Sequence, residues 1–160
     1  RQLREYGWAS KYLNEMRHGR NSRMDGLQAV LLSHALGTVA ASNRVRRNIF
    51  RRYAQCLPPQ WRLIGEDSER FVAHLCVLVA PNVEARNRMA RHLHASEIAN
   101  TVYYPLLDVD QPAWTGFGRR ADTLQNSYQL LDRILTIPCF PEMYEGEIVA
   151  VMAALTNFKS

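Results

Sequence analysis

The six residues that precede a long apolar segment include four side chains that could bind anions or cap a helix: Arg20, Asn21, Arg23 and Asp25. The amide of Asn21 offers two uncharged hydrogen-bond donors, and an arginine guanidinium binds carboxylates or phosphates through a planar fork. The simpler alternatives are that Asn21 forms a turn and that Arg23 anchors its own loop through an ion pair. Asp25 and Gln28 have the spacing of a capping box, in which each side chain accepts a backbone N–H of the first helical turn. The segment therefore predicts a polar loop capped onto a helix.

Few other residues have a spacing that suits catalysis or metal binding. Asp108 and Asp110 lie in a segment rich in Pro and Gly, where solvated loop carboxylates are the expected interpretation rather than an acid–base pair. The histidines and cysteines show no metal-ligand spacing and no disulfide framework, so we predict no metal site. These residues are His18, His34, His74, His92, His94, Cys56, Cys76 and Cys139.

The composition is typical of a globular domain, with 47% hydrophobic and 22% charged residues in 160. The net charge is +5, and only Lys11 and Lys159 of the 20 basic residues are lysines. An excess of arginine is typical of phosphate or nucleic-acid binding, and it also arises from genomic base composition alone. The longest apolar run, residues 71–81, is well short of the roughly 20 residues of a membrane span, so we expect no membrane contact.

The chain opens on Arg1 and shows no apolar leader, and its three cysteines suit a reducing compartment. We therefore expect a cytoplasmic protein and a sequence that is part of a longer one.

Apolar spacing predicts a helix over residues 25–57, ended by Pro58 and Pro59. A helix of about 33 residues is longer than most, so either Gly37 breaks it or it bridges two lobes. The other expected elements are a buried strand at 71–80, a helix at 83–96, a short strand at 101–104, and helices at 123–135 and 145–158. Together they predict an α/β fold in which helices cover a short sheet.

Three segments carry a resemblance to a known family. Residues 1–32 follow the pattern R-x-L-R-x-Y/H-G and then G-x-N-S-R-L-D-E-L-Q-A-A-I-L with conservative changes. Residues 104–114 look like H-Y-P-x-x-x-x-x-Q-P-A, and residues 135–144 look like L-x-L-P-x-x-P-x-L. In this order the three segments resemble the DegT/DnrJ/EryC1/StrS family of sugar aminotransferases, which use pyridoxal 5′-phosphate and have the type I aminotransferase fold.

The resemblance implies that the chain is the C-terminal part of such an enzyme. Residues 1–37 would end the large domain that binds pyridoxal phosphate, and residues 38–57 would form the connecting helix. Residues 58–160 would then form the small C-terminal domain, a short sheet with covering helices.

The resemblance also implies site residues. Asn21 matches the asparagine that reaches across the dimer interface to the cofactor phosphate of the partner. Arg23 matches the arginine placed to bind a carboxylate of the amino donor or a sugar-nucleotide phosphate, and Arg20 is a weaker candidate for the same substrate. Tyr103 stands where the family commonly has a histidine. If that histidine contacts the sugar or the cofactor phosphate, Tyr103 can replace its hydrogen bond but not its cationic form. The lysine that forms a Schiff base with the cofactor lies upstream in the family, so no catalytic residue is assigned to this chain.

The implied activity is amination of a nucleotide-linked keto-sugar with an amino-acid donor, by a homodimer and without nucleic acid. The fragment alone is expected to be inactive. One alternative is a non-catalytic, arginine-rich helical module that binds nucleic acid or an acidic partner, and a third is an assembly domain. The arginines that favour the module are Arg44, Arg46, Arg47, Arg51 and Arg52.

Overall fold

The computed structural model describes residues 4–6, 8–11, 13–15, 17–22, 24–112 and 123–159. The chain divides into two compact units, Arg1–Ala40 (unit 1) and Ala41–Ser160 (unit 2). One helix, α1 (Gly26–Ala54), begins in unit 1 and ends in unit 2.

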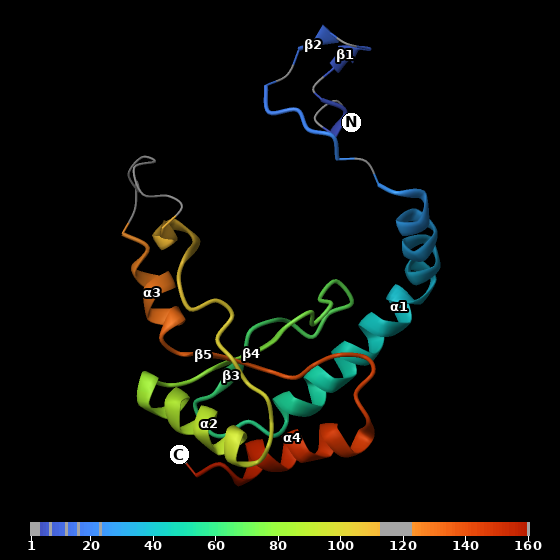
Figure 1. The fold of residues 1–160 in the computed structure, drawn as a ribbon. Coiled ribbons are helices and arrows are strands. Elements are labelled where there is room, and N and C mark those ends of the chain that lie inside the picture. Colours follow the sequence, from blue (N-terminus) through green and yellow to red (C-terminus); the bar gives the residue numbers. More distant parts are fainter. Residues whose placement is uncertain are drawn as a thin grey trace. The chain divides into compact units, whose positions relative to one another are not determined.

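Unit 1 contains a small antiparallel hairpin that the sequence analysis did not anticipate. Its strands are β1 (Trp8–Ser10) and β2 (Leu13–Asn14) (Figure 1). The ring of Tyr6 stacks on that of Trp8 with centroids 4.9 Å apart.

The prediction of one long helix after Asp25 is confirmed, because α1 runs without interruption past Gly37. It ends at Ala54, a few residues before Pro58 and Pro59, which cannot donate helical N–H bonds. Only its last third is buried, through Ile49, Phe50 and Tyr53.

Unit 2 is built on a three-stranded antiparallel sheet with the order β3-β4-β5. The strands are β3 (Arg62–Leu63), β4 (Cys76–Val79) and β5 (Ile134–Ile137). Helices α2 (Val83–Ala95) and α4 (Glu145–Asn157) lie on one face of this sheet and contact each other (Figure 1). This arrangement confirms the prediction of an α/β fold with a short sheet covered by helices.

The core of unit 2 lies between the sheet and these two helices. Leu78 and Leu135 from the sheet meet Met89 and Leu93 of α2 and Leu155 of α4, all at most 1% exposed. Each such side chain stabilises the fold by about 1.5–3 kcal/mol relative to exposure. Helices α2 and α4 match the predicted ranges 83–96 and 145–158 to within one residue.

The strand predicted over 71–80 is wrong in its first half, because the strand starts only at Cys76. Ala73 has a φ of 49°, in the left-handed region, which turns the chain out of an extended path. In addition, the carbonyl oxygen of Phe71 accepts a hydrogen bond from Arg47 rather than from a neighbouring strand.

Two further predictions are corrected near β5. The helix expected over 123–135 is the shorter α3 (Gln125–Leu131), and the residues after it form β5 against β4. Of the strand expected over 101–104, only Thr101 pairs, as an isolated bridge with Thr136. The loop in between carries a short 3-10 helix, η2 (Asp108–Asp110). Among the described residues, no helix combines the length and the apolarity that crossing a membrane requires.

Candidate functional site

The loop before α1 is held by main-chain contacts that leave its side chains exposed. Asn21 forms an isolated antiparallel bridge with Glu5, and the backbone N–H of Ser22 donates to the carbonyl of Arg4 over 3.0 Å. The side chains of Arg20 and Asn21 are exposed. The backbone at Asn21 is therefore fixed by hydrogen bonds while its amide faces outward.

The capping box predicted at the start of α1 is confirmed. The backbone N–H of Leu27 donates to Oδ1 of Asp25 over 2.8 Å, and the N–H of Asp25 donates to Oε1 of Gln28 over 3.3 Å. These reciprocal bonds satisfy N–H groups that have no intrahelical partner. They fix the first turn of α1 four residues after Asn21.

The structure describes only one of the other two predicted substrate residues. Arg23 lies outside the described residues. Tyr103 belongs to unit 2, where its ring is 46% exposed and lies 5.5 Å from the ring of Tyr104. The structure thus brings Arg20 and Asn21 together in unit 1 and places Tyr103 on unit 2.

Tyr103 borders a cavity of about 370 Å³ in unit 2. The segments that line it are the start of β4, the stretch from Ala99 to Tyr103, and the end of β5 with Pro138 to Phe140. Its walls are mainly apolar but include Cys76, Cys139 and Thr136. This cavity could not be predicted from the sequence, because its walls form only when β4 pairs with β5. The β-branched residues Ile134, Thr136 and Ile137 before Pro138 indicate a strand, but no local pattern indicates the cavity itself.

Neither lysine lies in an enclosed setting of the kind that a Schiff base with pyridoxal phosphate needs. Lys11 is exposed in the hairpin of unit 1, and Lys159 is exposed after α4. Neither is among the residues that line a described cavity. The exposed amide of Asn21 can donate a hydrogen bond to an oxygen atom of an anion such as phosphate.

No group of three or more His, Cys, Asp or Glu residues within the described part of the chain could hold a metal ion. Asp110 accepts a hydrogen bond from the hydroxyl of Tyr128 over 2.6 Å, and Asp108 is exposed, as expected for loop carboxylates. Nε2 of His92 lies 2.9 Å from the carbonyl oxygen of Ala154, which joins α2 to α4.

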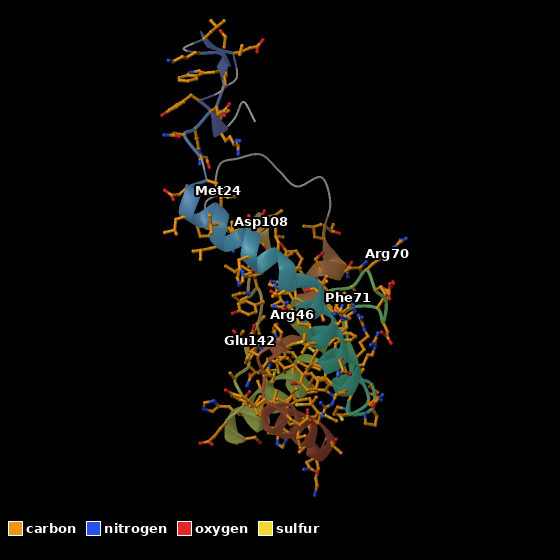
Figure 2. All side chains as sticks on the ribbon, turned by 90° about the vertical axis from the view of Figure 1, so that its right-hand side faces the viewer. Met24, Arg46, Arg70, Phe71, Asp108 and Glu142 are labelled. Atoms are coloured by element: carbon orange, nitrogen blue, oxygen red, sulfur yellow. The ribbon has the colours of Figure 1, made fainter. Side chains whose placement is uncertain are left out.

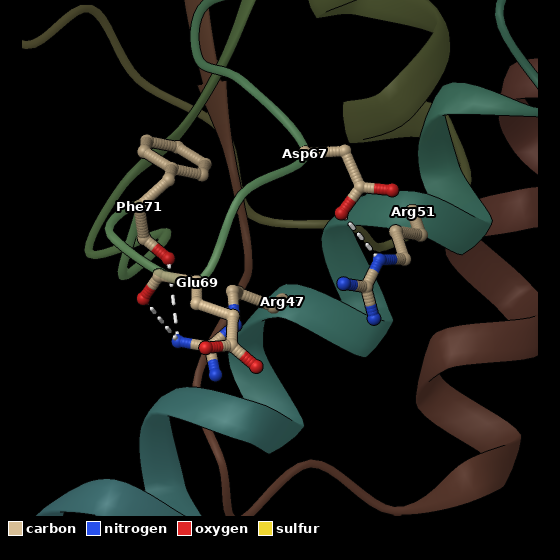
Figure 3. Close-up of polar contacts among 5 residues, drawn as sticks. All are labelled: Arg47, Arg51, Asp67, Glu69 and Phe71. Atoms are coloured by element: carbon tan, nitrogen blue, oxygen red, sulfur yellow. Dashed lines mark hydrogen bonds and ion pairs between the residues drawn. The ribbon is translucent and has the colours of Figure 1, made fainter.

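Two arginines of α1 fasten the loop that leads from β3 to β4 (Figure 3). Arg47 donates to the carbonyl oxygens of Glu69 and Phe71 over 3.4 Å each, and Arg51 pairs with Asp67. Figure 2 places Phe71 beside α1 and Arg70 on the outside of the same loop.

A third arginine joins α1 to α4. Arg52 binds both carboxylate oxygens of Glu145 in a two-bond fork. The hydrogen bonds from Arg52 hold the pKa of Glu145 below its ordinary value, and those to Glu145 raise the pKa of Arg52. Arg47, Arg51 and Arg52 therefore connect α1 to the loop between β3 and β4 and to α4 within unit 2.

Tyr53 is the one titratable group of α1 that is fully buried in the described chain. Burial raises the pKa of its phenol above the ordinary value, and the nearby thiols of Cys76 and Cys139 add to the shift. Its hydroxyl lies 3.9 Å from Sδ of Met143. The phenol is therefore neutral in the folded chain at neutral pH.

Comparison with known proteins gives consistent results. The chain is 30% identical, over 97% of its length, to a UDP-N-acetyl-3-dehydro-alpha-D-glucosamine 3-aminotransferase from Acidithiobacillus ferrooxidans. It is 28% identical, over 98% of its length, to a dTDP-3-amino-3,6-dideoxy-alpha-D-galactopyranose transaminase from Aneurinibacillus thermoaerophilus. It spans 41% and 42% of these two relatives, about two fifths of their length.

A solved structure agrees with this result. The crystal structure of DesV from S. venezuelae in complex with a ketimine intermediate matches 98% of this chain and 42% of that chain. The sequence identity is 27% and the TM-score 0.82. The family model for the DegT/DnrJ/EryC1/StrS aminotransferases matches residues 1–156. The chain therefore belongs to the DegT/DnrJ/EryC1/StrS aminotransferase family.

Proposed function

We propose that this chain is the C-terminal part of a pyridoxal phosphate-dependent aminotransferase that aminates a nucleotide-linked keto-sugar with an amino-acid donor. The observation that carries the proposal is the family match over residues 1–156, within which the loop and cap around Asn21 are formed as the motif predicts. The names of the relatives, which act on UDP- and dTDP-linked sugars, support this substrate class.

In this proposal Asn21 donates a hydrogen bond to the cofactor phosphate in the neighbouring subunit of a homodimer. When bound, the cofactor supplies the electron sink that amino-group transfer needs. The bridge to Glu5 supports the role of Asn21, because a fixed backbone lowers the entropy lost when the amide binds. Arg23, with Arg20 as a weaker contributor, binds a carboxylate or phosphate of the substrate.

Tyr103 is proposed to contact the sugar substrate at the mouth of the unit 2 cavity. Its phenol hydroxyl donates and accepts hydrogen bonds but carries no positive charge near neutral pH. A site with tyrosine here therefore binds a hydroxyl of the sugar more readily than a phosphate.

The domain assignment completes the proposal, with the large domain ending at residue 37, a connecting helix over 38–57 and the small domain over 58–160. The first part of α1 presents exposed apolar side chains and a shallow apolar cavity of about 380 Å³ within unit 1. We propose that the rest of the large domain and its dimer mate cover this face in a cytoplasmic enzyme. The exposed side chains are Leu27, Val30, Leu31, Leu32, Leu36 and Val39.

The test uses the full reading frame that contains this chain. The purified enzyme is incubated with pyridoxal phosphate, glutamate or glutamine, and a panel of UDP- and dTDP-linked keto-sugars, and the amino-sugar product is measured by mass spectrometry. Formation of an amino-sugar supports the proposal. A folded, cofactor-loaded enzyme that aminates ordinary 2-oxo acids and no sugar contradicts it.

The role of Asn21 is tested with Asn21→Ala in the same enzyme, with Asn87→Ala, an exposed amide on α2, as the matched control. A neutral donor to a charged acceptor contributes about 1.5–3 kcal/mol, so the dissociation constant for the cofactor rises roughly ten- to a hundredfold. Wild-type affinity in Asn21→Ala would show that the amide does not hold the phosphate.

Donation across the dimer is tested by mixing two variants at limiting cofactor. One carries Asn21→Ala, and the other lacks the upstream lysine. If Asn21 serves the partner's site, the mixed dimer holds one site with both residues intact, and activity returns. No recovery in mixed dimers would place Asn21 in its own subunit's site.

A further inference from the structure

Two of the three cysteines meet at the inner wall of the unit 2 cavity. Cys76 begins β4 and is fully buried, and Cys139 follows β5 and is 8% exposed. Both line the cavity of about 370 Å³. Of the two, only Cys139 is partly exposed and can be reached by a small molecule in the cavity.

The strand register explains why the two sulfurs face each other. Cys76 pairs with Ile137, and Cys139 lies two residues beyond that partner. Residues two apart along an extended chain point to the same face, and diagonal neighbours across an antiparallel pair are within reach of each other. A hydrogen bond joins the two thiols.

The surroundings make the two thiols unequal. The single S–H of Cys139 is shared between two carbonyl oxygens, that of Arg46 at 3.6 Å and that of Ala73 at 3.8 Å from Sγ. The hydrogen bond with Cys139 and the burial of Cys76 raise the pKa of Cys76 well above its usual range. The hydrogen bond from Cys76 and the nearby Arg46 guanidinium lower the pKa of Cys139. Cys139 is thus the thiol that ionises first and the one that attacks an electrophile.

We propose that Cys76 and Cys139 form a reversible oxidation site that a peroxide entering the unit 2 cavity converts to a disulfide. The sulfur of Cys139 loses its proton and attacks one peroxide oxygen, the O–O bond breaks, and the departing hydroxide takes a proton to become water. The sulfur of Cys76 then attacks the resulting sulfenic sulfur, the S–O bond breaks, and the second hydroxide leaves as water with the Cys76 proton. Two thiols are oxidised by two electrons, and one hydrogen peroxide is reduced to two waters.

The modification would act on the segments that the thiol of Cys139 connects. As a thiol, Cys139 links the end of β5 to α1 through Arg46 and to the turn at Ala73. As a disulfide it has no proton to donate, so both links are lost while β4 and β5 become covalently joined. The proposal concerns atoms within this chain and does not depend on the proposed aminotransferase activity.

The test uses the reduced, full 160-residue wild-type chain, treated with about one equivalent of hydrogen peroxide and then alkylated in denaturant. Peptide mass spectrometry should detect a crosslink between Cys76 and Cys139. Alkylation of both should fall at least about tenfold, and that of Cys56 by less than about twofold, because only the paired thiols form an intramolecular disulfide. Dithiothreitol should restore both thiols.

The same treatment in urea is the control for the folded geometry. If the native chain and the chain in urea give the same mixture of disulfides, or if Cys56 is the main site of oxidation, the proposal is wrong. Cys139→Ser tests the attacking group, since Cys76 should then remain reduced at the same peroxide dose. Stable sulfinic acid at Cys139 of the wild-type chain, without the crosslink, would also overturn the proposal.

Discussion

Replacing Tyr53 by phenylalanine should make the chain more resistant to alkali. Tyr53 is fully buried and its pKa is raised above its ordinary value, whereas in the unfolded chain it ionises near pH 10. Below that pH the neutral phenol contributes fully to stability, and above it the unfolded state gains stability by releasing the proton. The group therefore destabilises the fold progressively as pH rises toward the folded pKa.

The magnitude follows from the linkage between pKa and stability. Each pH unit above about 10 removes about 1.4 kcal/mol from the free energy of unfolding as long as the folded phenol stays neutral. At a pH of about 11.5 the wild type should therefore have lost roughly 2 kcal/mol through this residue, and Tyr53→Phe should have lost none of it. At pH 7 the two chains should differ by less than about 1 kcal/mol, since the hydroxyl's contact is a weak one to Sδ of Met143.

The measurement is urea unfolding at a series of pH values between 7 and about 11.5, with the ultraviolet absorbance of tyrosinate recorded in parallel. The pKa of Tyr53 also depends on ionisable groups near it, namely Cys76, Cys139, Arg52 and Glu147. These groups are present in both chains, so the difference between variant and wild type isolates the phenol. Tyr144→Phe, at a tyrosine that is 79% exposed, should lose as much stability above pH 10 as the wild type does. Parallel loss of stability in Tyr53→Phe and wild type above pH 10 would refute the reasoning.

Three further outcomes are expected. Borohydride reduction of the 160-residue chain with pyridoxal phosphate should give no stoichiometric adduct, and an adduct mapped to Lys11 would contradict the proposed division of the active site. Gly65→Ala should destabilise unit 2 by about 1–3 kcal/mol in thermal unfolding, because φ is +133° and the added Cβ would lie 2.3 Å from the ring of Phe71. Gly146→Ala, on a helix with nothing within 4 Å, should instead be neutral or stabilising. Arg52 lowers the pKa of Glu145, so the stability contributed by this ion pair is present above about pH 4.3 and is lost as pH falls through the folded pKa. In urea unfolding, Glu145→Gln should therefore lose less stability on acidification than the wild type.

Much of the local structure was predictable because it depends on residues close in sequence. The capping box needs only Asp25 and Gln28, and the apolar spacing of α2 marks Met89 and Leu93 as buried. The double proline at 58 and 59 predicts the end of α1 to within a few residues, since the helix ends at Ala54.

The errors lie where distant residues decide the structure. Strand β5 follows α3 so closely that its apolar residues continue the helical pattern, and only pairing with β4 selects the extended form. The first half of the expected strand at 71–80 is lost to a turn at Ala73 and to Arg47, 24 residues from Phe71. The cavity beside Tyr103 depends on the same pairing, so no local pattern could reveal it.

The order of the elements along the chain has a consequence for synthesis on the ribosome. Leu78, Met89 and Leu93 belong to elements that emerge early, but the side chains that cover them come from β5 and α4. A nascent chain from which β5 and α4 have not yet emerged therefore carries an unpaired strand edge on β4 and an open apolar surface, the features that chaperones bind and that lead to aggregation. Any delay in synthesis before β5 and α4 have left the ribosome would lengthen this exposure.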